Sequence, residues 1–468
     1  GDFYEMFFED AEVVSHALEL TLTGRNAGLE EKVPMCGVPH HAVDIYVDKL
    51  IKQGFKVAIC EQLEDPKNAK GIVKRDVTEV ISSGTIISSN SLDEKSNNYI
   101  GSIYDYEYCY TIVYTDITTG ELYAEIIPHD SNKLINDILS FGLKEVVVNQ
   151  IVDQTIIKLL KEQYHLTVTI VNQILESDEY KFCYKTVKDQ RYITAIKHLL
   201  YYLVIEQKRS LGHLQKVIIN ETDNFLKMDI HTKRNLELTE SIRLKDRNYS
   251  LLWLLDNTKT AMGSRKLKQW IEAPLKEKRP IEKRHEVVSN LIDEFILTED
   301  LRRNLYEIYD LERLSGRIAL GNANGRDLIQ LKNSLKVLPN IAEMLKQINF
   351  YSDINPLTDL YDLLEQSIYE EPPITIKEGY LIKKGYSTEL DELKELRSGG
   401  KDFISKFELE EKERTGIKNL KVGFNKVFGY YIEISKGNLS LITEDMGYIR
   451  KQTLTNCERF ITPLLKEK

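Results

Sequence analysis

The chain has 468 residues, of which 42% are hydrophobic and 29% charged, and its formal net charge is −10. This length is too great for one hydrophobic core and predicts about three or four domains, while no apolar run approaches the roughly 18 residues that a membrane-spanning helix needs. We therefore expect a cytoplasmic protein without a membrane segment, and reduced thiols rather than disulfides or a zinc site at the scattered cysteines Cys36, Cys60, Cys109, Cys183 and Cys457.

The first ten residues carry the most informative pattern in the chain. The sequence opens on Gly1 and an aromatic cluster rather than on Met, so we expect a fragment of a longer protein. If residues 2–6 are extended, Phe3 and Glu5 point to one face and Tyr4 to the other. A hydrophobic core accepts a phenylalanine and rejects a carboxylate. The pair is therefore either a buried Phe beside a solvent-facing Glu or a functional pair.

Residues 1–95 are expected to form a small α/β domain. Ala11, Val14 and Leu18 repeat at helical spacing, and an apolar stripe from Val43 to Ile51 predicts a second helix that ends near Gly54. Strands are expected at residues 20–23, 56–60 and 77–81, and a loop is expected at Gly24, Asn26 and Gly28. Residues 85–98 are rich in Ser and Asn without periodicity, which predicts a linker.

Residues 99–215 alternate between strand and helix patterns. Strands are expected at residues 99–103, 110–115, 122–127, 145–148 and 166–171, and helices at residues 133–141 and 155–163. Strands that alternate with helices favour a βαβ layer with a mostly parallel sheet. We therefore expect a second, α/β domain here.

The last two regions of the chain differ in the spacing of their hydrophobic residues. Leucines at helical spacing predict an all-α region at residues 228–407, which leads into one long amphipathic helix over 388–414. Residues 420–424 and 429–434 alternate as strands, residues 451–455 are expected to pair with them, and an antiparallel β domain is predicted at 408–468. An acidic chain is unusual for a nucleic-acid binder, but residues 415–468 carry nine basic and five acidic side chains, which permits contact with phosphates.

Several long motifs resemble, in one order, the bacterial MutS family of mismatch-repair proteins. They are GDFYEMFFEDA, LTLTGRN, VPMCGVPHHA, KVAICEQLEDP, GIVKRDV, KRNLELTESIR, SLLWLLDNTKTAMGSRKLKQWI, YDLERLSGRIALGNANGRDLIQLK and LKVGFNKVFGYYIEISK. The resemblance covers essentially the whole chain. It implies a mismatch-recognition domain at 1–95, a connector with RNase H-like topology at 99–215, a helical lever and core at 228–407, and an antiparallel β clamp at 408–468.

The resemblance also implies roles for Phe3 and Glu5. In the family, this Phe-x-Glu pair enters the minor groove at a mispaired or unpaired base. An apolar wedge unstacks and kinks the duplex at a lower free-energy cost where pairing is already broken, so a mismatch is found through its deformability. Glu5 would be repelled by phosphates, and two accounts stay open. Its carboxylate accepts a hydrogen bond from a base N–H group, or it is protonated and donates one.

Further candidates for DNA contact follow from the matching stretches. In the first domain they are Arg25, Met35, His41 and Arg75, for which surface charge, core packing and a helix start are the plain alternatives. In the clamp, the candidates for backbone contact are Lys421, Asn425, Lys426, Lys436, Arg450 and Lys451. A metal site at His40 and His41 is not expected, because adjacent side chains point apart and no further ligand stands at suitable spacing.

The sequence contains no G-x-x-x-x-G-K-[ST] phosphate loop, so the chain itself is expected to bind no cofactor and to be no enzyme. The resemblance implies that ATP and Mg bind a further domain of a complete parent, which forms a homodimer, acts at the nucleoid on mismatched double-stranded DNA and recruits a MutL-type partner. Two alternatives stay open. One is a metal-dependent nuclease that uses the connector, although Asp105 and Asp116 stand alone on their strands. The other is a structural scaffold that does not bind DNA.

Overall fold

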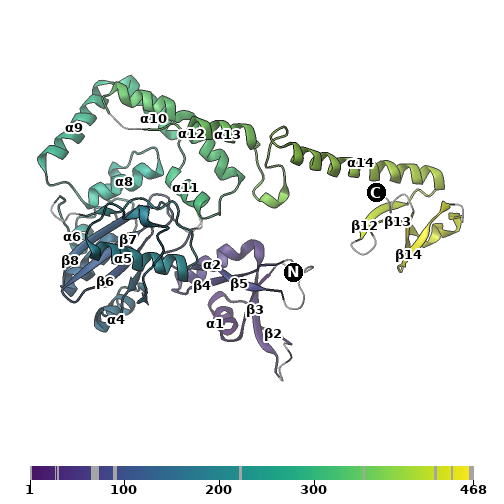
Figure 1. The fold of residues 1–468 in the computed structure, drawn as a ribbon, viewed down its shortest axis with the longest axis horizontal. Coiled ribbons are helices and arrows are strands. Elements are labelled where there is room, and N and C mark those ends of the chain that lie inside the picture. Colours follow the sequence, from purple (N-terminus) through teal and green to yellow (C-terminus); the bar gives the residue numbers. More distant parts are fainter. Residues whose placement is uncertain are drawn as a thin grey trace. The chain divides into compact units, whose positions relative to one another are not determined.

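The structure is a computed structural model. It describes the whole chain except residues 1–2, 27, 29–30, 65–72, 88–91, 221–223, 351–353, 426–428, 444–445 and 463–468, and the side chains of 377, 396–403 and 425 are likewise not described. The chain divides into two compact units, residues 1–381 and 382–468 (Figure 1). Among the described residues, no helix combines the length and the apolar character needed to cross a membrane.

The first unit opens with a small α/β domain. Its elements are β1 (Phe3–Phe7), α1 (Phe8–Leu18), β2 (Thr23–Arg25), β3 (Val33–Pro39), the 3-10 turn η1 (His40–Ala42), α2 (Val43–Lys52), β4 (Val57–Gln62) and β5 (Arg75–Ile81). One antiparallel sheet has the order β1-β3-β2, and β4 pairs with β5 in another. α1 packs on β3, and α2 contacts α1, β3 and β4. The two predicted helices are confirmed. The strand expected at 20–23 begins only at Thr23, and Gly24, expected in a loop, lies within it.

A six-stranded sheet follows. Its strands are β6 (Tyr99–Asp105), β7 (Cys109–Thr115), β8 (Leu122–Pro128), β9 (Leu143–Val148), β10 (Thr167–Ile170) and β11 (Ile218–Ile219), in the order β10-β9-β6-β7-β8-β11. Three of the five pairings are parallel, but β6, β7 and β8 form an antiparallel meander. The sheet is therefore mixed, because the short loops after β6 and β7 reverse the chain where a parallel pairing would need a long crossover.

Helices cover both faces of this sheet. They are α3 (Ser131–Phe141), α4 (Gln154–Glu162) and α5 (Gln190–Tyr201), with a 3-10 turn η2 (Lys181–Cys183) and a π-helical turn η3 (Tyr202–Glu206). One apolar cluster joins Ile103 and Ile112 of the sheet to α3 and α4. A second cluster joins Ile100 and Val113 to α5. Alternate strand residues thus serve opposite faces, as expected for a sheet buried on both sides.

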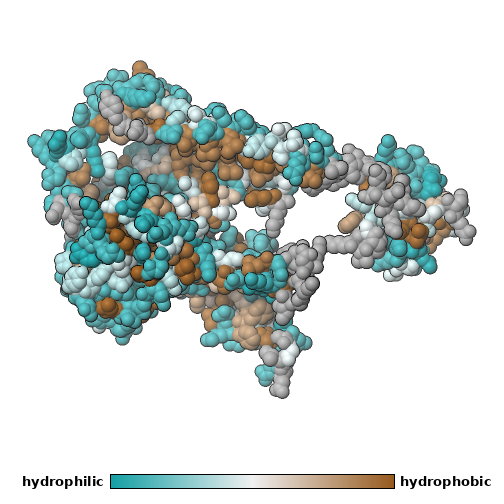
Figure 2. Space-filling model, viewed as in Figure 1, coloured by the Kyte–Doolittle hydropathy of each residue, from teal (hydrophilic) through white to brown (hydrophobic). Residues whose placement is uncertain are grey.

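The rest of the first unit is helical. Its elements are α6 (Ile230–Asn235), α7 (Leu251–Leu255), α8 (Ala261–Glu272), α9 (Lys278–Asp293), α10 (Phe295–Tyr306), α11 (Leu311–Ala319), α12 (Gly325–Gln347), α13 (Thr358–Ser367) and the 3-10 turn η4 (Ile376–Glu378). α12 packs against α10, α11 and α13. Large apolar side chains stay exposed here, among them Phe295, Ile296 and Tyr306, and Figure 2 shows apolar residues at the surface of this helical part.

The second unit combines one long helix with a small sheet. Its elements are α14 (Thr388–Thr415), β12 (Lys421–Asn425), β13 (Gly429–Ser435), the 3-10 helix η5 (Lys436–Leu441), β14 (Ile449–Thr453) and β15 (Cys457–Ile461). The helix predicted over 388–414 is confirmed, and the predicted domain boundary at 408 falls inside it. The sheet order is β12-β13-β15-β14. The expectation that residues 451–455 pair with the first two strands is therefore wrong, because β14 pairs with β15, which the sequence analysis missed.

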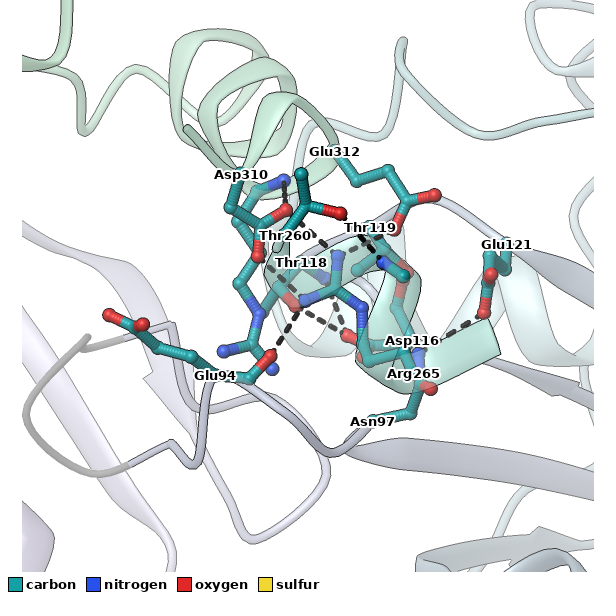
Figure 3. A network of polar contacts seen from close by, with 12 residues as sticks. Glu94, Asn97, Asp116, Thr118, Thr119, Glu121, Thr260, Arg265, Asp310 and Glu312 are labelled. Carbon is teal, nitrogen blue, oxygen red and sulfur yellow. Dashed lines mark hydrogen bonds and ion pairs between the residues drawn. The ribbon is translucent and has the colours of Figure 1, made fainter. Parts of the chain in front are cut away.

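A buried polar network ties the linker after the first domain to the helical part (Figure 3). The Arg265 guanidinium of α8 donates to both carboxylate oxygens of Asp310, at 2.6 and 2.8 Å, and to Glu312 at 2.6 Å. It also donates to the Glu94 carbonyl at 2.8 Å. Burial alone would lower the pKa of Arg265, but these carboxylates raise it. The linker is thus held by charge-assisted hydrogen bonds.

The same network holds the linker from two further sides. Arg313 of α11 donates to the Asp93 and Ser96 carbonyls at 3.1 and 2.7 Å. Asp116, which follows β7, accepts from the Asn98 amide at 3.0 Å and from the Asn97 side chain at 3.2 Å. Residues 93–98 therefore bridge the six-stranded sheet and the helices, although their composition alone indicated only a linker.

Candidate nucleic-acid interface

The outer face of β1 presents the Phe-x-Glu pair. β1 is an edge strand that pairs with β3, with Phe3 opposite Pro39, Glu5 opposite Gly37 and Phe7 opposite Met35. Residues directly opposite each other in an antiparallel pair share a face, so Phe3, Glu5 and Met35 lie on the same side of the sheet. The Phe3 side chain is 61% exposed. Residues 3–7 are therefore extended, and the prediction that Phe3 and Glu5 point to one face and Tyr4 to the other is confirmed.

Tyr4 supports this strand from the opposite face. Its hydroxyl donates a hydrogen bond to Glu61 of β4, and its ring stacks on His40 with a centroid distance of 5.3 Å. Burial and the Glu61 carboxylate raise the pKa of Tyr4 to about 12, so the phenol stays a neutral donor. The contact fixes the strand that carries Phe3 and Glu5, and the sequence analysis did not single it out.

Glu5 is paired with Arg25. The Arg25 Nη1 atom of β2 lies 2.7 Å from the Glu5 Oε2 atom, and the two side chains are 57% and 37% exposed. Gly37 lies opposite Glu5, and a Cβ atom there would stand 3.2 Å from the Tyr4 carbonyl oxygen and 3.7 Å from the Phe3 ring. The absence of a side chain at Gly37 thus keeps the surface beside Phe3 and Glu5 open. Sequence reasoning named Arg25 but not this ion pair.

The other candidates in the first domain, Met35, His41 and Arg75, do not all lie beside Phe3. A cavity of about 1030 Å³ is lined by Phe3, Glu5, Arg25 and Arg75, among others. Met35 is half-buried on the Phe3 face, and His41 is exposed in η1, directly after β3. The structure therefore groups Glu5, Arg25 and Arg75 with Phe3, whereas Met35 and His41 do not line this cavity.

The basic candidates of the second unit lie on different elements of its sheet. Lys421 begins the edge strand β12, Arg450 and Lys451 lie on the opposite edge strand β14, and Lys436 begins η5; all four are exposed. Arg450 pairs with Glu458 at 3.4 Å, and the register of β14 shifts at Lys451. Asn425 ends β12 with its side chain undescribed, and Lys426 lies outside the described residues. Three of the four candidates whose side chains are described thus lie on the two edge strands of one small sheet.

Comparison with known proteins accounts for nearly the whole chain. Residues 1–90, 98–215 and 231–457 match the family models described as MutS domain I, MutS domain II and MutS domain III. The chain belongs to the MutS family. The Phe3 and Glu5 face lies in its MutS domain I, and the mixed α/β, multidomain structure with several antiparallel sheets is consistent with these domains.

Curated relatives with the same family name are closely similar. The chain is 48% identical to the DNA mismatch repair protein MutS of Bacillus licheniformis, 49% to that of Bacillus subtilis and 48% to that of Listeria monocytogenes, each over all of this chain. It covers 54%, 55% and 55% of those proteins. The chain thus spans about half the length of the curated relatives that it matches.

The carboxylates of Asp105 and Asp116, in MutS domain II, have structural partners. Asp105 pairs with His129 at 3.2 Å, and Asp116 accepts hydrogen bonds from the Thr118 amide at 2.9 Å and from its hydroxyl at 2.6 Å. Within the described part of the chain, no three His, Cys, Asp or Glu residues are grouped so that they could hold a metal ion. These residues therefore offer no observation in favour of a metal-dependent nuclease.

Proposed function

We propose that this chain recognises mispaired or unpaired bases in duplex DNA, as the first step of DNA mismatch repair. The observation that carries the proposal is the exposed Phe3 side chain on an edge strand, beside the carboxylate of Glu5. A large apolar side chain that stays in water at a sheet edge is suited to insertion between base steps from the minor groove. The names of the curated relatives support the same role.

Discrimination would come from the deformability of the duplex. Insertion of Phe3 unstacks a base step and kinks the DNA, which costs least where pairing is already broken. Glu5 would then contact the exposed base, either by accepting a hydrogen bond from it or as a protonated donor. Arg75 and Arg25 line the same cavity and are suited to nearby phosphates. Such contacts position the domain without reading base identity.

The test compares two duplexes that differ at one base. We expect Phe3→Ala to reduce the preference for a G·T-mismatched duplex over its perfectly paired twin by about tenfold or more, because the wedge acts only where stacking is weak. Fluorescence anisotropy with labelled duplexes measures both affinities. The matched control is Phe295→Ala, since Phe295 is 69% exposed on α10. Equal loss of preference in both variants, or a wild-type chain without any preference, contradicts the proposal.

The second unit would bind the DNA backbone. We expect Lys436→Gln to weaken binding to mismatched and paired duplexes by the same factor and to lower the slope of log K against log salt by about 1, because one phosphate contact is lost. Titrations at several salt concentrations measure the slope. Lys158→Gln on α4 removes an equally charged, exposed side chain and serves as the control. A change in mismatch preference without a change in slope would contradict a backbone role for Lys436.

We also propose roles for the other parts of the chain. The strand order β8-β7-β6-β9-β10 supports an RNase H-like connector at 99–215, and the helical region and the β sheet of the second unit would be the lever and the clamp. We infer that the chain itself has no enzymatic activity, in keeping with the lack of a phosphate loop in its sequence. ATP and Mg, homodimer formation and a MutL-type partner are proposed for the complete protein.

A further inference from the structure

Glu5 poses an electrostatic problem for a DNA-reading surface. Duplex DNA carries one negative charge per about 1.7 Å of helix axis, so an ionised carboxylate beside Phe3 would be repelled from every duplex. In the structure, the ion-pair partner of Glu5 is Arg25, at 2.7 Å. The two residues are 20 positions apart in the chain and come from β1 and β2, the outer strands of a three-stranded sheet. The sheet therefore brings a counter-charge to the reading face.

Folding stability does not account for this pair. Both side chains are substantially exposed, at 57% and 37%, and exposed ion pairs contribute little to the free energy of unfolding. Near DNA the two charges differ in their effect, because phosphates attract the guanidinium and repel the carboxylate. As a pair they carry no net charge. The open surface at Gly37, opposite Glu5, leaves room for a base edge beside the pair.

We propose that Arg25 is a positioning residue that neutralises Glu5, so that the carboxylate can enter the groove beside Phe3. Phe3, Glu5 and Arg25 then act as one reading unit, in which Phe3 unstacks, Glu5 accepts a hydrogen bond from the base and Arg25 cancels the repulsion. This inference rests on the proposed function and deepens it. It also assigns Arg25 a role beyond that of a phosphate contact, since its effect depends on the charge at position 5.

A double-mutant cycle tests this dependence. The variants are Arg25→Met, which keeps the aliphatic stem without the charge, Glu5→Gln and the double substitution. Each is titrated by fluorescence anisotropy with a G·T-mismatched duplex and its paired twin. We expect Arg25→Met to weaken binding to both duplexes by about tenfold, because Glu5 is left as an unpaired negative charge. Glu5→Gln should then restore affinity about fivefold in the Arg25→Met background, and this factor should differ clearly from its effect in the wild-type background, where Arg25 already pairs with the carboxylate.

The control is Arg302→Met. Arg302 pairs with Glu299 at 2.9 Å on α10, and the two side chains are 51% and 42% exposed, close to the values for Arg25 and Glu5. Its substitution changes the net charge equally and should leave both affinities within about twofold. Far-UV circular dichroism checks that each variant is folded.

The outcomes separate the inference from the function on which it rests. If Glu5→Gln changes affinity by the same factor in both backgrounds, Arg25 is an ordinary phosphate contact and the inference fails, while a Phe3-dependent mismatch preference keeps the proposed function. If the wild-type chain binds both duplexes equally, the reading function fails, and the cycle on the paired duplex still decides whether Arg25 neutralises Glu5. Loss of all DNA binding overturns both.

Discussion

Replacing Arg265 by methionine is expected to lower the free energy of unfolding of the first unit by about 3–5 kcal/mol, the cost of breaking a buried ion pair by removing one partner. The Arg265 side chain is 2% exposed and holds Asp310 with two hydrogen bonds and Glu312 with one. Methionine fills much of the same volume without the charge. The two carboxylates are then left close together in a partly buried site without their cation.

Urea unfolding followed by circular dichroism measures this loss of stability. Arg303→Met is the control, because Arg303 and Asp300 form an exposed pair, at 78% and 42%, which should contribute no more than about 1 kcal/mol. A loss at Arg265 no larger than at Arg303 would contradict the role of the network.

The sequence predicted the elements whose signals are local. Val43 to Ile51 carry an uninterrupted apolar stripe, and the helix there matches it; α14 likewise begins at its Ser387 cap and ends at Gly416. β3 was missed because it contains Pro34, Gly37 and Pro39, which are rare in strands. β15 was missed because its pairing with β13 and β14, on either side, stabilises a strand that contains Glu458 and Arg459. Such pairing is not visible in a short window of sequence.

In the candidate site, too, the local features were predictable and the contacts between distant residues were not. Strand alternation alone placed Phe3 and Glu5 on one face, since only neighbouring residues are involved. The ion pair between Arg25 and Glu5 depends on β3, which lies between their two strands and was not predicted. The hydrogen bonds from Arg265 and Arg313 to the linker carbonyls could not be predicted at all, because every residue has a backbone carbonyl and the residue type does not show which one accepts.

Gly316→Ala is expected to lower the free energy of unfolding by about 1–3 kcal/mol, the usual cost of overpacking a filled site. A Cβ atom at Gly316 of α11 would lie 2.1 Å from the Thr118 carbonyl oxygen and 2.9 Å from its carbonyl carbon. Both are backbone atoms, so no side chain can rotate away. Helix propensity favours alanine over glycine by about 1 kcal/mol, so a net loss would show that the close approach outweighs it. Urea unfolding, with Gly212→Ala as the control because nothing lies within 4 Å of a Cβ there, measures the difference.

Gly316→Ala should also destabilise the linker that follows the first domain. Thr118 donates to Asp116 through its amide and its hydroxyl, and Asp116 accepts from the Asn98 amide at 3.0 Å. A shift of Thr118 away from α11 therefore disturbs the carboxylate that holds Asn98. We expect the Asn98 amide to exchange its hydrogen faster in Gly316→Ala than in wild type or Gly212→Ala, because local opening becomes easier. Unchanged exchange at Asn98 together with lost stability would mean that α11 moves and the Thr118 turn stays in place.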